Sequence, residues 1–175
     1  KYKYYMNECA IDNYFLYGND CNKKYRQINS TVNVLLSSYH QDAGFAILRS
    51  EDIYLFVANG GLDKYENSTI KPLGTHTHAD LLSFELAIGE NDVFVDPGAY
   101  IYTANAKTNI EFRSTRKHNT IAIDGRNQYI LDEKNVFVGR NFPSPQYLFI
   151  DKQNDYEICR GKYQIMIEDN KKIEH

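Results

Sequence analysis

The chain has 175 residues, of which 42% are hydrophobic and 25% are charged, and its formal net charge is −3. This length suits one domain with a real core and leaves no room for a second large domain. Lysine and arginine are spread along the chain without a basic patch, which argues against nucleic acid as a partner. No apolar run approaches membrane-spanning length, and the amino terminus lacks a signal-peptide core.

The three cysteines, Cys9, Cys21 and Cys159, have neither a metal-ligand spacing nor the density of a disulfide scaffold. We therefore expect free thiols, with a disulfide between Cys9 and Cys21 as the alternative. Because the chain does not begin with Met, we expect it to be a piece of a longer protein. Its localisation stays open on the residues alone.

Residues 1–38 have a mixed pattern. An aromatic cluster at residues 14–17 runs into a Gly-Asn-Asp turn signal, and residues 31–37 fit a strand or a helix equally well. We interpret residues 1–38 as a linker arm and residues 39–175 as the folded domain.

A β pattern begins at residue 43. Residues 44–49 and 53–58 predict a first hairpin, and residues 82–88, which alternate strictly between apolar and other side chains, predict a second hairpin with residues 93–95. The sequence between the two hairpins is a polar loop that leads to a His-Thr-His motif.

The remaining pattern is also strand-rich. Residues 99–117 lack alternation and predict a long loop, of the kind that often holds functional residues on a β scaffold. Residues 146–150, 156–160 and 163–167 predict a three-stranded meander. We therefore expect an all-β, mainly antiparallel sandwich with an N-terminal linker arm.

Three of the five histidines gather with one aspartate in the middle of the chain. His76 and His78 share one side of the backbone if residues 75–79 form a strand or a strand end. Asp96 follows an apolar strand, and His118 opens a predicted strand at residues 118–123. Each histidine alone is more often a hydrogen-bonded surface or half-buried residue than a ligand. Two imidazoles and a carboxylate on separate strands nevertheless predict a site for zinc or a similar divalent ion.

Other polar residues near these motifs are candidates for substrate contacts. We rank Arg113 above Arg116 as a bidentate partner for a substrate carboxylate, with support of a metal-binding carboxylate as the alternative. Glu85 is a further candidate for a substrate contact, with a solvated or cleft-wall carboxylate that has no catalytic role as the alternative. Tyr100 and Tyr102 lie in the predicted loop across the site.

Four ordered motifs within about 54 residues carry a resemblance to a known family. They are HTHAD with SFE at residues 76–80 and 83–85, VDPGAY at 95–100, FRST with HNT at 112–115 and 118–120, and DGRNQ at 124–128. Together they resemble the heparinase II/III-like polysaccharide lyases.

The resemblance implies roles residue by residue. In that family the first histidine of the pair belongs to the active-site cleft, which corresponds to His76, while the zinc ligands correspond to His78, Asp96 and His118. Family members join an N-terminal helical toroid to a C-terminal β-sandwich, and the motifs here belong to the sandwich. The resemblance also implies a periplasmic or secreted bacterial protein.

The implied function is lytic cleavage of an acidic, uronate-containing polysaccharide by β-elimination, with a structural zinc ion. Without the toroid, its catalytic tyrosine and its Asn/His pair, we expect the 175-residue chain alone to be inactive. The main alternative is a non-catalytic, metal-stabilised sandwich that binds glycans or packs on a partner domain. A hydrolase that uses a metal-activated water is a third hypothesis.

Overall fold

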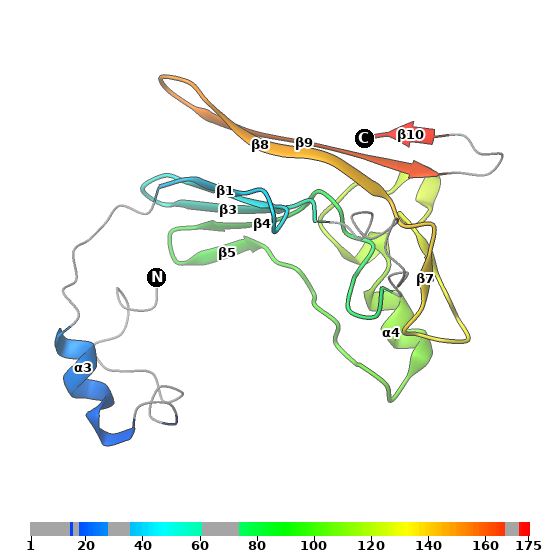
Figure 1. The fold of residues 1–175 in the computed structure, drawn as a ribbon, viewed down its shortest axis with the longest axis horizontal. Helices are drawn as coiled ribbons and strands as arrows, with labels where there is room; N and C mark the ends of the chain where they lie inside the picture. The colour runs from blue at the N-terminus through cyan, green and yellow to red at the C-terminus, as the bar shows by residue number, and fades with distance from the viewer. Residues whose placement is uncertain (1–14, 16–17, 28–35, 61–73, 167–171) are drawn as a thin grey trace. The chain divides into compact units, whose positions relative to one another are not determined.

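The computed structural model describes residues 15, 18–27, 36–60, 74–166 and 172–175 (Figure 1). It contains two compact units, Lys1–Leu35 and Leu36–His175. The described part of the first unit holds a 3₁₀ turn, η1 (Gly18–Asp20), and a short helix, α3 (Cys21–Gln27). Most of the predicted arm lies outside the described residues, so the division at residue 38 stays a prediction.

Two cysteines can be compared with the sequence prediction. Cys21 is disulfide-bonded, so the prediction of a free thiol at this position is wrong. Cys159 is free, as predicted. Cys9 lies outside the described residues.

The larger sheet of the second unit has five antiparallel strands in the order β1-β2-β3-β4-β5. The strands are β1 (Ser38–His40), β2 (Phe45–Arg49), β3 (Ile53–Ala58), β4 (Ser83–Ile88) and β5 (Asn91–Phe94). Both predicted hairpins are confirmed, and β3 pairs with β4 along its whole length. Near the start of β2, Gly44 has φ +70°, and a Cβ there would lie 2.5 Å from the Cα of Gly60, so the close approach of these two segments requires glycine.

The second sheet has three strands in the order β10-β9-β8. They are β8 (Ser144–Lys152), β9 (Glu157–Met166) and β10 (Lys172–Glu174). A meander is present, but the predicted break after residue 160 is wrong, because Gly161 continues one long strand. A Cβ at Gly161 would lie 2.2 Å from Cδ2 of Leu82, so glycine is needed here for packing rather than for a turn.

The two sheets form the layers of a sandwich, since β8 and β9 pack over β1 and β2 (Figure 1). Leu81, Tyr163 and Ile165 are the buried centre of one core cluster, with Leu82, Ile123 and Ile173 packed against them. A second cluster is formed by Ala79, Tyr129 and Leu131. The predicted fold class, an all-β and mainly antiparallel sandwich, is therefore confirmed.

The predicted long loop at residues 99–117 contains a helix, α4 (Ala106–Phe112), and a 3₁₀ turn, η3 (Thr115–Lys117). Asn105 caps α4, because its side chain accepts a hydrogen bond from the backbone N–H of Thr108 at 3.0 Å. Asn109 is buried and donates to the carbonyls of Ile101 and Tyr102. A seven-residue helix is too short to show a helical period in the sequence.

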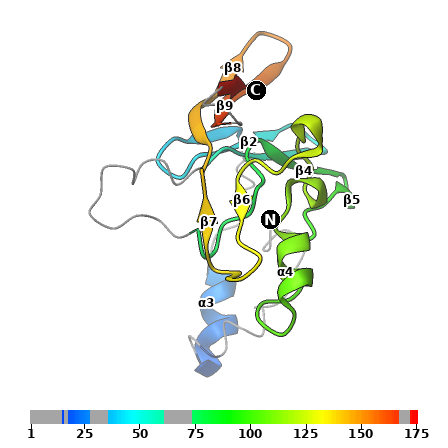
Figure 2. The same ribbon diagram turned by 90° about the vertical axis from the view of Figure 1, so that its right-hand side faces the viewer.

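Two predicted strands of the site are also absent. The His-Thr-His motif begins in a turn at His76 and continues as irregular backbone through His78, and the segment after His118 leads into η4 (Ile123–Gly125) rather than a strand. The short pair β6 (Ile130–Leu131) and β7 (Gly139–Arg140) follows. Figure 2 shows β6, β7 and α4 together at one end of the two sheets. Among the described residues, no helix is long and apolar enough to span a membrane.

Candidate functional site

Arg113 holds the segment that carries His76 and His78. It is only 3% exposed. Its Nε donates to the carbonyl of Thr77 at 3.0 Å, and Nη2 donates to the carbonyl of Gly74 at 2.6 Å and to the hydroxyl of Tyr129 at 3.3 Å. Nη1 donates to the carbonyl of Val136. A guanidinium has five N–H donors, so most of this donor set is used to fix the backbone of the loop.

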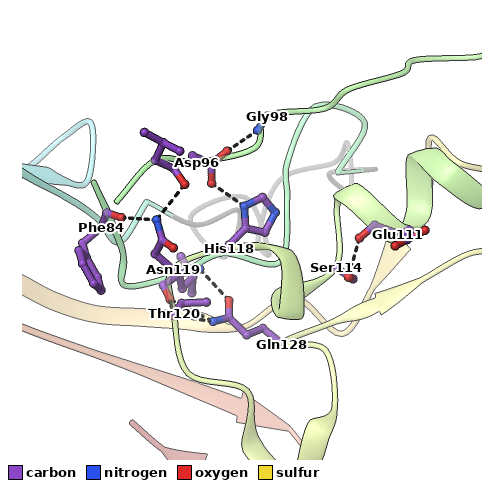
Figure 3. A network of polar contacts seen from close by, with 11 residues as sticks. Phe84, Asp96, Gly98, Glu111, Ser114, His118, Asn119, Thr120 and Gln128 are labelled. Carbon is purple, nitrogen blue, oxygen red and sulfur yellow. Dashed lines mark hydrogen bonds and ion pairs between the residues drawn. The ribbon is translucent and has the colours of Figure 1, made fainter. Parts of the chain in front are cut away.

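The same loop is fixed from its other end by buried amides. Gln128 accepts from the N–H of Leu81 at 2.7 Å and donates to the carbonyl of Leu81 at 3.0 Å. Thr120 donates to that carbonyl at 2.6 Å. Asn119 donates to the carbonyls of Phe84 and Val95, both at 3.0 Å, and so ties β4 and the end of β5 to the His118 segment (Figure 3). These bonds replace the strand pairing that the sequence predicted.

This scaffold brings together the three residues predicted to bind a metal. His78, Asp96 and His118 each offer one ligand atom, and these atoms lie within 4.8 Å of one another. Asp96 faces His118, with 2.6 Å between Oδ2 and Nδ1, while Oδ1 accepts from the N–H of Gly98 at 2.8 Å (Figure 3). The ring centroids of His78 and His118 are 5.1 Å apart. The convergence places two imidazoles and one carboxylate around a common point.

The donor set fits a borderline divalent cation. The His118 side chain is fully buried, and its Nε2 has no hydrogen-bond partner among the described residues, which is costly unless another group occupies that position. Burial lowers the pKa of His78, although Asp80 opposes this effect, and a neutral imidazole is the form that binds metal. Burial also raises the pKa of Asp80, which lies near both histidines.

His76 lies in a different environment. It lines a pocket of about 140 Å³. Its Nδ1 lies 2.8 Å from the hydroxyl of Tyr102, and the two rings stack with centroids 5.9 Å apart. Tyr102 also contacts the ring of Phe137, at 5.5 Å. The full lining is Thr75, His76, His78, Ala99, Tyr102, Asn109, Arg113, Val136 and Phe137. His78 therefore joins this pocket to the group of predicted metal ligands.

The structure separates the predicted substrate-binding residues from one another. Arg113 lines the pocket but is mostly engaged with backbone carbonyls, so its contacts are those of a structural residue. Tyr100 is 77% exposed, stacks on Phe112 at 4.8 Å and does not line the pocket. Glu85 is exposed on β4. Partial desolvation of its carboxylate, together with the nearby charges of Asp96 and Asp92, raises its pKa. Substrate contacts by these three residues stay predictions.

Some residues of the site could not be assigned a role in it from the sequence. Asn109 lines the pocket from α4, and Phe137 lines it from the turn before β7. Gln128 supports the pocket indirectly, because it holds the backbone of Leu81 just after the histidine loop. Only the Asn105 cap could have indicated α4, and only the DGRNQ motif included Gln128. Tyr102 was named beforehand, but its bond to His76 was not.

Residues 36–162 match the family model described as "Heparinase II/III-like, C-terminal". The chain therefore belongs to this family, as its motifs predicted. Family membership indicates the C-terminal domain of a heparinase-like polysaccharide lyase. No curated protein and no solved structure matches the chain.

Proposed function

We propose that this chain is the β-sandwich part of a lyase that cleaves a uronate-containing acidic polysaccharide by β-elimination. The observation that carries the proposal is the pairing of His76 with Tyr102 in a pocket, directly beside the converging His78, Asp96 and His118. Family membership supplies the reaction class, and this pairing supplies groups suited to it.

β-elimination requires a base for the proton α to the uronate carboxylate, donors for the developing enolate, and an acid for the leaving glycosidic oxygen. A Tyr102 hydroxyl that donates to Nδ1 of His76 fixes the imidazole tautomer with its proton on Nε2. His76 then has one N–H to offer to the anion that forms in the pocket. Tyr102 acts as a positioning residue for that donor.

His78, Asp96 and His118 would hold a divalent ion, with zinc as the metal that the family resemblance implies. When bound, the ion cross-links three segments that are distant in sequence and neutralises the Asp96 carboxylate. The role proposed for it is structural. Held by these three residues, the ion would fix the position of His78 and, through the short loop, that of His76 two residues earlier.

The remaining acid and base are proposed to come from an N-terminal helical domain of the same protein. Proton transfer by a positioned group contributes typically 10² to 10⁴-fold to the rate, so losing several such groups removes nearly all activity. We therefore expect the 175-residue chain alone to produce no unsaturated uronate from heparin, heparan sulfate, alginate or hyaluronan. Activity above a His76→Ala control would show that the sandwich holds its own acid and base.

The test of the proposed function uses the longer protein that contains this chain. It is incubated with the same four polysaccharides, and absorbance near the ultraviolet edge is followed, because elimination leaves a conjugated unsaturated uronate. Shortened products without this absorbance would indicate a hydrolase. Binding without shortened products would indicate a glycan-binding module, and either result would overturn the lyase proposal.

A further inference from the structure

Two exposed aromatic rings lie side by side on the outward face of the β8–β9 hairpin. Tyr147 and Phe149 are two residues apart on β8, so both project from the same face of the strand. Their ring centroids are 5.6 Å apart, and the residues are 47% and 40% exposed. Leu148 between them is buried and faces the core. Figure 1 shows the tip of this hairpin rising away from the β1–β5 sheet.

Cationic side chains flank these rings. In the β8–β9 register, Tyr147 lies opposite Lys162 and Phe149 lies opposite Arg160, so all four project from one face. Lys162 forms an ion pair with Glu174 at 2.7 Å. Arg160 reaches Asp151 only at 3.9 Å, beyond hydrogen-bonding distance, and its side chain is 54% exposed. Within the part of the chain that the structure describes, Arg160 has no closer ion-pair partner, so its guanidinium donors are available beside the Phe149 ring.

The charge on this face differs in sign from that of the whole chain. Strand alternation places Lys172 on the same side as Glu174. Among the described strand residues, Arg160, Lys162 and Lys172 therefore share this face with Asp151 and Glu174. The chain as a whole has a net charge of −3. An anionic ligand is thus attracted here by the local field.

We propose that this hairpin platform, formed by Tyr147, Phe149, Arg160 and Lys162, is a second binding site for an anionic polysaccharide, separate from the His76 pocket. The proposal rests on the proposed function for its ligand class. Aromatic faces present flat apolar area to the apolar faces of sugar rings. Arg160 supplies the planar fork that matches a carboxylate or sulfate group. The platform would hold the polymer while another part of it occupies the pocket.

The experiment measures binding of the 175-residue chain to heparin and to alginate by isothermal titration calorimetry. We expect the Tyr147→Ala/Phe149→Ala double variant and Arg160→Ala each to weaken binding roughly tenfold or more, given the usual strength of charge-assisted and aromatic contacts. Tyr39→Ala and Arg140→Ala are matched controls, since they remove an exposed tyrosine from β1 and an exposed arginine from β7. Thermal melts check that all variants are folded.

Each outcome distinguishes the platform from the proposed function. Loss of binding in the platform variants but not in His76→Ala supports the platform. The reverse pattern overturns it and leaves the pocket as the binding site. Equal affinity for neutral dextran, or no binding by the unaltered chain, also overturns it, while product absorbance still tests the lyase reaction. A smaller species of the double variant in size-exclusion chromatography would instead identify a self-association surface and overturn the polysaccharide proposal.

Discussion

His76 and His78 are separated by one residue, yet the structure gives them opposite surroundings. His78 faces Asp96 and His118, and burial lowers its pKa. His76 is paired with an exposed tyrosine in an open pocket. The contrast shows how one short turn can give two neighbouring histidines different surroundings, which suits the structural role proposed for His78 and the chemical role proposed for His76. The turn remains rigid only while its carbonyls are held.

The largest effect is expected from Arg113→Met, which removes the support of both histidines. The carbonyls of Gly74, Thr77 and Val136 lose a buried charged donor, and each such bond contributes about 1.5–3 kcal/mol. We expect unfolding free energy to fall by roughly 3 kcal/mol or more in urea titrations. Arg140→Met, at an exposed ion pair, is the control and should leave the midpoint unchanged. Similar midpoints for the two variants would show that the loop does not depend on Arg113.

The comparison between the two histidines is tested directly by single substitutions. His78→Ala should reduce bound metal to near zero and lower the melting temperature, because it removes a ligand and with it the stabilisation that binding gives the fold. His76→Ala should leave both nearly unchanged. Metal content is measured by elemental analysis and stability by thermal melting. Equal loss of metal in the two variants would contradict the separate roles.

Tyr102→Phe tests the chemical side of the contrast in the longer protein. It removes the hydroxyl at 2.8 Å from Nδ1 of His76 and keeps the ring contact with Phe137. We expect kcat to fall roughly ten- to a hundredfold through the wrong imidazole tautomer or orientation, with KM and metal content unchanged. The pH profile of kcat should shift as well. An unchanged profile with a raised KM would indicate substrate binding rather than positioning.

Asn119→Ala should have the smallest effect and act on the metal side alone. Its side chain joins the carbonyls of Phe84 and Val95, so its loss should cost about 1–2 kcal/mol and weaken metal binding roughly tenfold by releasing Asp96. The affinity is measured by competition with a chromophoric chelator. If Asn119→Ala also changed the fluorescence of a ligand bound in the His76 pocket at saturating metal, the two environments would be coupled and the prediction would be wrong.

The sequence predicted the parts of this molecule that depend on local pattern. Residues 82–88 alternate strictly, and all but the first of them form β4. The HxH, Asp-Pro-Gly and His-Asn-Thr motifs identified side chains that converge in space. The backbone that carries those side chains was not predictable in the same way. His78 and His118 lie in irregular segments whose hydrogen bonds go to Arg113, Gln128 and Asn119, and such long-range partners leave no period in the sequence. The break predicted at Gly161 failed because its packing partner, Leu82, is far away along the chain.

Gly161 also sets how closely β9 can approach the segment that follows the histidine loop. One face of β9 carries Arg160 and Lys162 of the hairpin platform, and at Gly161 the other face contacts Leu82, which follows the histidine loop and has φ +56°. Because residue 161 has no side chain, only the β9 backbone separates Leu82 from the outer surface of the sheet at this position. A methyl group at residue 161 would clash with the Leu82 side chain, so either that side chain or the β9 backbone would have to move.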